Sequence, residues 1–282
     1  MITVFLQGGL GNQLFQLYAY LSFCLDTGDK IILPLKKMDK YSAEGYPRNT
    51  YWDTLFKRLS FFVKDDKELY SVPFYNEPFY RHHPLIKYDN GLSYRFRGYF
   101  QSWKYFDKHF FRINKMIGIE TLKKNIAIKY PDYFKKDIVS LHFRIGDYKN
   151  IQDSHPVLGN QYYINSINEM IKRLGTDTFT ILIFFEEVDL KQIIIKTKIF
   201  KKRFKNINFI KINTNIEDWE QMLIMSNCAH HIIANSSFSW WGAYFNLNKN
   251  KIVLYPDIWF GKKLNHDTSD LCHPSWNKIS SH

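Results

Sequence analysis

Two adjacent serines follow a short apolar run near the C-terminal end of the chain, in a pattern that suits anion binding. Residues 230–234 read as a buried strand, and Asn235, Ser236 and Ser237 come directly after it. A tight turn into a helix here would offer backbone N–H groups and the positive end of a helix dipole, with hydroxyls as further donors. The pattern indicates a phosphate-binding helix start. The structural alternative is a serine cap on a helix whose two tryptophans fill the core.

A second polar group stands at the end of a predicted strand over residues 138–144. His142 and Arg144 occupy alternate positions, so the two-residue period of a strand places both on the same face. A permanently charged guanidinium suits a diphosphate leaving group, whose negative charge grows as a glycosyl bond breaks. Asp147 would either orient Arg144 or serve as a base. The structural alternative is an ion pair of these two residues beside a core histidine.

A glycine-rich loop, residues 8–13, follows the first predicted strand and opens a predicted helix. It resembles a dinucleotide-binding fingerprint, which suggests an oxidoreductase as one alternative. However, a leucine stands at the third glycine position, and no acidic residue follows the second strand. Gly9 and Gly11 would let the backbone approach a ligand, and Asn12 and Gln13 can bond sugar hydroxyls or phosphate. The plain alternative is a tight turn.

An acidic residue, Asp218, begins a predicted helix upstream of the serine turn. Its carboxylate could accept hydrogen bonds from N1 and N2 of guanine, which adenine cannot match. The alternative is an ordinary acidic residue at a helix N-terminus, where negative charge is favourable.

The order of elements predicts an α/β chain. After residue 131, strands alternate with helices, which is typical of a parallel, doubly wound sheet with ligands at the carboxyl ends of its strands. The expected strands cover residues 138–144, 179–185, 208–212 and 251–255, with one at His231, and the expected helices 161–174, 190–197 and 218–226. The part of the chain before residue 131 is expected to contain a strand over residues 4–6, a helix over residues 14–25 and a second strand over residues 30–33. An irregular, aromatic-rich segment follows over residues 41–130. We therefore predict two domains, 1–130 and 131–282.

Composition limits the class of protein. With 282 residues, 45% of them hydrophobic, the chain can bury two ordinary domains. Its apolar runs are far shorter than the roughly 20 residues that span a bilayer, and its first residues read as a strand, not a signal peptide. Three widely spaced cysteines, Cys24, Cys228 and Cys272, fit a reducing compartment. These features favour a cytoplasmic protein.

The net charge of +12 suggests a polyanionic partner. A basic cluster lies on and after one predicted helix and comprises Lys191, Lys196, Lys198, Lys201, Lys202, Arg203 and Lys205. Such clusters are most often solvated surfaces. Peripheral contact with an anionic membrane is the functional reading, and nucleic-acid binding is the minority alternative, which we do not expect.

Four motifs in order resemble the α-1,2-fucosyltransferases of glycosyltransferase family 11. They are Gly-Gly-Leu-Gly-Asn-Gln-Leu-Phe-Gln at 8–16, Gly-Tyr-Phe-Gln-Ser at 98–102, His-x-Arg-x-Gly-Asp-Tyr at 142–148, and the run 218–242 that ends in Trp-Trp-Gly. Four matches in register are far more specific than any single one. One departure is Ile145, where many members carry a second arginine, so Arg144 is the single cation of its motif.

The resemblance implies a GT-B-type fold, with two Rossmann-like α/β domains facing a cleft. It also implies GDP-β-L-fucose as donor, transfer to the 2-hydroxyl of a terminal galactose, and inversion at the fucose anomeric carbon. Residues 1–130 would form the acceptor side and 131–282 the donor side. No metal or other cofactor is expected, which agrees with the lack of any Asp-x-Asp sequence. The acceptor would be a galactose-terminated glycan, with a lipid-linked glycan as one option.

The resemblance also assigns roles to residues. Arg144 would contact the β-phosphate, and His142 and Asp218 the guanosine part of the donor. The remaining donor-binding residues would be Gly9, Gly11, Asn235, Ser236 and Ser237. Asn12 would lie near the phosphate and the acceptor, and the expected acceptor-side residues are Gln13, Tyr99, Gln101 and His155. Asp147 is the candidate general base, with Glu186, Glu187 and His155 as rivals.

Overall fold

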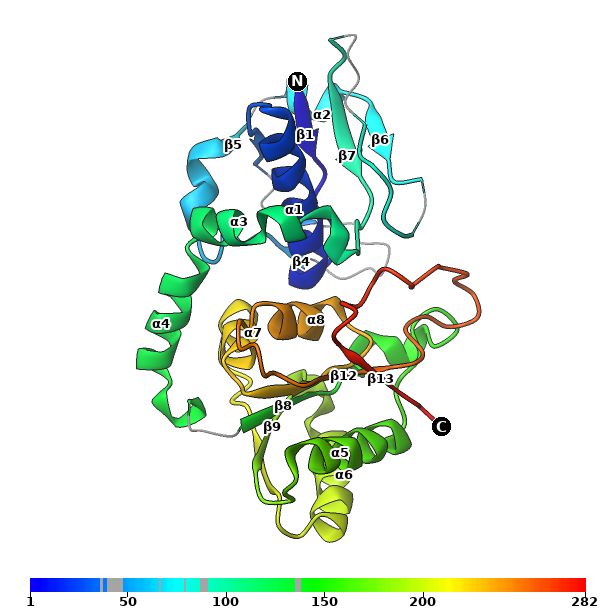
Figure 1. Ribbon diagram of the computed structural model, residues 1–282. Coiled ribbons are helices and arrows are strands. Elements are labelled where there is room, and N and C mark those ends of the chain that lie inside the picture. The colour runs from blue at the N-terminus through cyan, green and yellow to red at the C-terminus, as the bar shows by residue number, and fades with distance from the viewer. Residues whose placement is uncertain (36–37, 40–47, 66, 79, 87–90, 135–137) are drawn as a thin grey trace. The chain divides into compact units, whose positions relative to one another are not determined.

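The chain folds into two α/β units. The computed structural model describes residues 1–35, 38–39, 48–65, 67–78, 80–86, 91–134 and 138–282 (Figure 1). One unit contains Met1–Leu122 and His266–His273, and the other contains Lys123–Asn265 and Pro274–His282. The division falls inside helix α4 (Ile119–Lys129), whereas the sequence pattern places it at residue 130.

The first unit is built on a parallel sheet with the strand order β1-β7-β6, formed by Ile2–Val4, Tyr94–Arg97 and Phe74–Asn76. Helix α1 (Leu10–Thr27) follows β1 and ends at Gly28, whose positive φ of 72° suits a residue without a side chain. This confirms the predicted order of strand, loop and helix, although β1 ends at Val4, before the predicted end at residue 6, and α1 begins at Leu10, before the predicted start at residue 14. The second strand, β2 (Leu33–Pro34), is shorter than predicted and pairs with β5 (Val63–Lys64).

The remaining elements of the first unit are short. They are β3 (Met38–Asp39), β4 (Arg48–Asn49), α2 (Glu68–Ser71), α3 (Phe110–Ile117) and the 3₁₀ helices η1 (Lys57–Phe62), η2 (Trp103–Tyr105) and η3 (Asp107–His109). This agrees with the irregular character of the sequence there, part of which lies outside the described residues.

The second unit contains a six-stranded sheet in which every neighbouring pair is parallel, with the order β10-β9-β8-β11-β12-β13. Its strands are β8 (Ile138–His142), β9 (Thr180–Phe184), β10 (Asn208–Lys211), β11 (His230–Ile232), β12 (Val253–Pro256) and β13 (Asn277–Ile279). Its main helices are α5 (Asn160–Leu174), α6 (Leu190–Arg203), α7 (Asp218–Ser226) and α8 (Ser237–Tyr244), with the 3₁₀ helices η4 (Pro131–Tyr133), η5 (Gly146–Asn150) and η6 (Glu187–Asp189). The α/β class with parallel sheets in two units is therefore confirmed, while the cleft between the domains stays a prediction.

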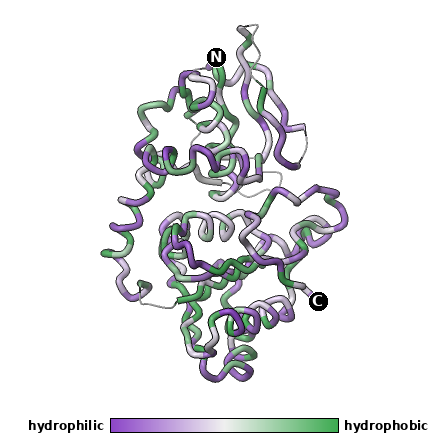
Figure 2. The backbone as a smooth tube through the Cα atoms, in the orientation of Figure 1, coloured by the Kyte–Doolittle hydropathy of each residue, from purple (hydrophilic) through white to green (hydrophobic). Residues whose placement is uncertain are grey.

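Helices cover both faces of this sheet, α5 and α6 on one and α7 and α8 on the other (Figure 1). All five residues of β8 are consequently buried, Ser140 and His142 included, and the central strands are hydrophobic in Figure 2. The two-residue period therefore does not separate a buried face of β8 from an exposed one. The strand also ends at His142, so its two-residue period does not extend to Arg144.

The helix that follows the serine turn is anchored in the core. Trp240 and Trp241 of α8 are both 0% exposed. At the C-terminal end of α8, Lys251 Nζ donates to the carbonyl of Ala243 at 2.9 Å and Lys123 Nζ to that of Phe245 at 3.1 Å. These cations satisfy carbonyls that the helix leaves unbonded, and their charge is favourable at this end of the dipole.

Buried His231 should make the stability of the second unit depend on acidity. Its ring lies between Ser140 Oγ, 2.8 Å from Nδ1, and Asn246 Nδ2, 2.8 Å from Nε2. Burial, reinforced by the charge of Lys251, holds the pKa of His231 well below its usual value. The unfolded chain therefore takes up a proton below about pH 6.5 that the folded chain refuses, so the free energy of unfolding falls as the pH falls.

We expect His231→Gln to flatten that decline by up to about 1.4 kcal/mol per pH unit. Urea unfolding between about pH 7 and about pH 5 measures this slope. His282→Gln, at the exposed C-terminus, is the control and should keep the wild-type slope. Equal slopes for His231→Gln and the wild type would contradict the role given to His231.

Candidate functional site

The carboxyl edge of the second unit's sheet brings distant parts of the chain together. Strands β8 and β11 are parallel neighbours, with Ile232 opposite Leu141, so the segments that leave them begin side by side. One segment carries Arg144 and the other the serine turn. Strand β9 pairs with the other side of β8, which brings Glu186 to the same edge.

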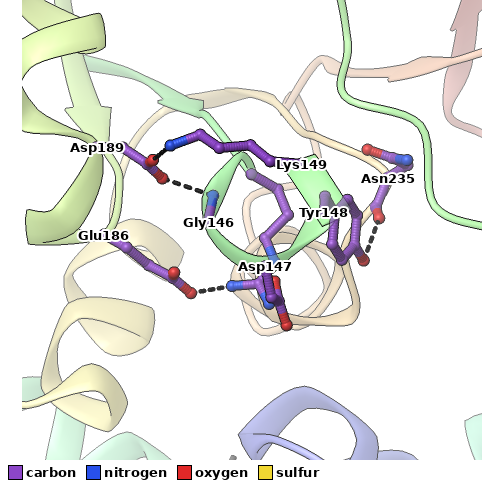
Figure 3. A network of polar contacts seen from close by, with 8 residues as sticks. Gly146, Asp147, Tyr148, Lys149, Glu186, Asp189 and Asn235 are labelled. Carbon is purple, nitrogen blue, oxygen red and sulfur yellow. Dashed lines mark hydrogen bonds and ion pairs between the residues drawn. The ribbon is translucent and has the colours of Figure 1, made fainter. Parts of the chain in front are cut away.

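A direct hydrogen bond joins the two segments. Tyr148 Oη donates to the backbone carbonyl of Asn235 at 3.1 Å (Figure 3). The Asn235 side chain is buried, and its Nδ2 donates to the carbonyls of Pro156 at 2.9 Å and Trp259 at 3.2 Å. Among the described residues, its buried Oδ1 has no hydrogen-bond partner. Asn235 therefore braces the serine turn against neighbouring loops.

Arg144 is held by two carboxylates and an aromatic ring. Its Nη2 lies 2.5 Å from Asp147 Oδ1, its Nη1 forms an ion pair with Glu186 Oε1, and its Cζ lies 4.9 Å from the centre of the Tyr148 ring. The Asp147 side chain is 10% exposed and that of Glu186 is 44% exposed. Of the two roles that the sequence leaves open for Asp147, this geometry favours orienting Arg144.

His142 is buried and neutral. It is 6% exposed, and its ring centre lies 5.5 Å from that of Phe238 in α8. Burial, reinforced by the charge of Arg144, lowers the pKa of His142 to about 3. No group among the described residues bonds its buried Nδ1. Near neutral pH this imidazole offers a hydrogen bond without a charge, which suits a nucleoside better than a phosphate.

The loop that carries Asp147 is fixed by a carboxylate that the sequence analysis missed. The side chain of Asp189 is 0% exposed, its Oδ2 accepts from the backbone N–H of Gly146 at 2.7 Å, and its Oδ1 lies 2.6 Å from Lys149 Nζ. Figure 3 shows Asp189 and Glu186 on one side of this loop and Asn235 on the other. In the sequence, Asp189 looks like any acidic residue just before a helix, so the available signal was weak.

The serine turn has the predicted form. Ser236 precedes α8 in an extended conformation, with φ −143° and ψ 128°, and its side chain makes no capping hydrogen bond. The turn is closed instead by Ser239, whose Oγ accepts from the backbone N–H of Ala234 at 3.2 Å. Ser236 is 6% exposed and Ser237 is half-buried. The capping alternative therefore does not account for the Ser236 hydroxyl.

The other predicted residues of the second unit lie at the same edge. Asp218 begins α7 after β10, is exposed, and accepts from the backbone N–H of Trp219 at 2.7 Å. His155 stacks on Tyr148 with ring centres 4.9 Å apart, so it joins the Arg144 loop. Glu187, a rival for the base, bonds Thr214 instead.

Asn12 and Gln101 are in direct contact in the first unit. Gln101 Nε2 donates to Asn12 Oδ1 at 2.9 Å, and Tyr80 Oη donates to Gln101 Oε1 at 2.5 Å. Tyr80 in turn stacks on His266, with ring centres 4.1 Å apart. Tyr80 and His266 were not predicted, since aromatic residues are common throughout this part of the sequence.

The glycine loop in the first unit is shorter than the sequence pattern suggests. Gly9 is the residue before α1, so Gly11 lies inside the first turn of the helix. Gln13 is 3% exposed and its Nε2 donates to the carbonyl of Gly8 at 2.9 Å. The structure therefore has Gln13 bracing the loop from inside, in contrast to the predicted contact with an acceptor.

Glu77 holds the turn that leads to Gln101. Its Oε2 accepts from the backbone N–H groups of Tyr99 at 2.7 Å and Phe100 at 2.9 Å. Phe100 has a φ of 50°, which is unfavourable for a residue with a side chain. Burial raises the pKa of Glu77 to about 7, against the effect of the two amides. Glu77 was not predicted as a functional residue, and Tyr99, a predicted acceptor-side residue, is 37% exposed.

In the part of the chain that the structure describes, no group of three or more His, Cys, Asp or Glu residues is arranged to hold a metal ion. No helix there has both the length and the apolar character that crossing a bilayer requires.

Comparisons with known proteins give a consistent family. The family model for glycosyl transferase family 11 matches residues 1–280. An Escherichia coli α-1,2-colitosyltransferase is 27% identical over 295 residues, which cover 99% of this chain and 99% of that protein. The E. coli O-antigen biosynthesis glycosyltransferase WbnK is 30% identical over 193 residues, which cover 63% of this chain and 58% of that protein.

Solved structures are more distantly similar. POFUT1 in complex with GDP-fucose matches with a TM-score of 0.46 and 9% identity, covering 99% of this chain and 96% of that chain. E. coli ADP-heptose LPS heptosyltransferase II matches with a TM-score of 0.37 and 10% identity, covering 57% and 43%. Because both TM-scores are low, the assignment rests on the sequence matches.

Removing the Asp189 carboxylate should destabilise the second unit and loosen the Arg144 loop. Asp189→Ala leaves the Gly146 N–H and the Lys149 ammonium without their partner, so we expect a loss of about 2 to 4 kcal/mol in the free energy of unfolding. Urea unfolding measures it. Glu169→Ala, which breaks the exposed pair with Arg173 at 2.6 Å in α5, is the control. The free energy of unfolding of that variant should fall by less than about 1 kcal/mol. Equal losses in the two variants would contradict the role of Asp189 in holding the Arg144 loop.

Proposed function

Because this chain belongs to glycosyltransferase family 11, we propose that it transfers L-fucose from GDP-β-L-fucose to the 2-hydroxyl of a terminal galactose in a glycan. The family match covers residues 1–280, and an α-1,2-specific transferase is similar over 99% of the chain. The structural observation that carries the proposal is the link between the Arg144 loop and the serine turn through Tyr148 and Asn235 at 3.1 Å. This link supports a site in which a cation and a helix N-terminus act together at the carboxyl edge of a parallel sheet.

The proposed donor site separates the two ends of GDP-fucose. As the bond to fucose breaks, negative charge grows on the β-phosphate, where Arg144, the Ser236 and Ser237 hydroxyls and the positive end of α8 would stabilise it. Neutral, buried His142 and exposed Asp218 would bind the guanosine part. The stabilising groups are held in place before the reaction, so they need no reorganisation during it.

The acceptor step would proceed with inversion. The galactose hydroxyl attacks the anomeric carbon from the face opposite the departing diphosphate, forming the new C–O bond as the old one breaks, and its proton passes to a base. Asp147 remains the proposed base, with Glu186, Glu187 and His155 as rivals. The pairing of Asp147 with Arg144 supports the orienting role, and the variants below distinguish the two.

We also propose that the reaction needs no metal, since a cation and a helix N-terminus can together stabilise the leaving diphosphate. The protein would act in the cytoplasm.

A colitosyl donor is the second candidate. The relative that matches 99% of the chain is a colitosyltransferase. GDP-colitose differs from GDP-fucose by the loss of one ring hydroxyl, so a site built to bond that hydroxyl would discriminate strongly in favour of fucose.

A donor panel tests the proposal. GDP at about 100 times its dissociation constant should stabilise the protein by about 2.7 kcal/mol, visible as a shift of several degrees in the melting temperature. UDP, NAD and an oligonucleotide are the controls and should shift it much less. Turnover of GDP-fucose should then require a galactoside such as lactose and should persist in EDTA.

Four results of the donor panel would contradict or change the proposal. No stabilisation by GDP would contradict the donor site. A higher kcat/KM for GDP-colitose than for GDP-fucose would replace the first candidate with the second. Loss of turnover in EDTA would contradict metal independence, and turnover of neither sugar with any galactoside would contradict the proposed reaction.

Exchanging Glu186 should strengthen nucleotide binding. Glu186 occupies Arg144 from its exposed side, at 44% exposure, so a diphosphate would have to displace it. We expect Glu186→Gln to lower the Kd for GDP about two- to fivefold, as expected when an exposed ion pair no longer competes. Isothermal titration calorimetry measures the change.

Asp147→Asn is the matched variant, because it removes the same charge from the buried side of Arg144. It should not tighten GDP binding, since the gain in attraction is offset by the loss of the group that orients the guanidinium. Equal tightening in both variants would contradict that orienting role. A loss of at least about 100-fold in kcat with unchanged GDP affinity would instead identify the substituted carboxylate as the base.

A further inference from the structure

The exposed side of α6 combines aliphatic and basic residues, and we propose that it binds the surface of an anionic membrane. This inference does not depend on the donor or the acceptor of the reaction. The opposite side of the helix is fixed in the core by Ile193, Thr197 and Phe200, which are all buried. Their spacing of four and then three residues defines one helical face, so the exposed side is defined as well.

The outer face, defined as Lys191, Ile195, Lys198, Ile199 and Lys202, lies opposite this buried stripe. Its members are spaced by three or four residues along the helix and therefore form one surface. Ile195 is 61% exposed and Ile199 is 42% exposed. Exposed isoleucines in adjacent turns are costly in water unless another surface covers them.

Two more aliphatic side chains lie next to the outer face. Ile194 is 39% exposed, and Val188, just before α6, is 75% exposed. Val188, Ile194, Ile195 and Ile199 thus expose apolar atoms within and just before a single helix.

The charge of α6 has one sign. The helix contains six basic residues and no acidic one. Lys196 is directed inward, where its Nζ donates to Asn160 Oδ1 at 2.6 Å, but Lys191, Lys198, Lys201 and Lys202 are exposed. Within the described ranges, none of these four lysines forms an ion pair with a protein carboxylate. Their charge is therefore available to an external anion.

The interleaving of the two residue types favours a lipid surface over a nucleic acid. Lysines alone would suit any polyanion, but a phosphate backbone gives no place for four exposed aliphatic side chains. At a membrane, isoleucines enter the boundary between headgroups and acyl chains while lysines reach the anionic headgroups from the same helix.

Flotation with lipid vesicles tests the proposal on the full chain. We expect the wild type to float with vesicles that contain about 30 mol % phosphatidylglycerol and to stay unbound with phosphatidylcholine alone. Lys198→Glu/Lys202→Glu should lower the fraction bound at least about tenfold, because each lysine near the surface contributes about a factor of five. Lys249→Glu/Lys278→Glu changes the same charge at exposed sites outside α6 and should bind like the wild type.

The aliphatic residues need a separate variant. Ile195→Ser/Ile199→Ser should lower binding to anionic vesicles severalfold, and Ile128→Ser, at an exposed position in α4, is the control that should not. Circular dichroism and thermal melting establish that each variant is folded.

Three results would overturn the proposal. They are equal flotation of the wild type with both kinds of vesicle, equal losses in the α6 and control lysine variants, and unchanged vesicle binding in the isoleucine variant. Polynucleotide binding that is lost with the lysines but unaffected by the isoleucines, together with no flotation, would assign the surface to nucleic acid instead.

Discussion

The parallel pairing of the six strands in the second unit is the constraint on which the candidate site depends. Parallel strands all point the same way, so every segment that leaves a carboxyl end begins at one edge of the sheet. Arg144 after β8, Glu186 after β9, Asp218 after β10 and Asn235 after β11 are collected there although they are far apart in the chain. The sheet thus determines which residues can act together, and the loops determine how.

Buried polar contacts fix those loops. Asp189 holds the Arg144 loop through Gly146 and Lys149, and Tyr148 joins the same loop to Asn235. Glu77 performs a similar task in the first unit, where its two hydrogen bonds support the unfavourable backbone of Phe100. In each unit, a carboxylate therefore acts by fixing backbone geometry.

Local sequence patterns predicted the helices and strands well, but they did not predict contacts between residues that are far apart in the sequence. Helix α7 begins and ends where its periodicity indicates, and Gly175 ends α5 in a left-handed conformation, as its place after the last apolar residue suggests. The position of the serine turn at the carboxyl edge of the sheet could be predicted from the order of strands along the chain. The role of Asp189 and the inward direction of Gln13 depend on what lies across the fold, and the burial of β8 on both faces depends on helices later in the chain. No local sequence pattern predicts these three features.

The return of His266–His273 to the first unit has a consequence for the way such proteins can recombine. There His266 stacks on Tyr80, Asp270 pairs with Lys104, and His273 packs against Trp103. Neither unit is therefore a continuous stretch of sequence. A chimaera that joins the N-terminal part of one family member to the C-terminal part of another would carry a foreign segment against Tyr80 and Trp103. Grafting one whole unit onto another family member therefore requires two crossover points, and evolution by simple end-joining of halves is correspondingly restricted.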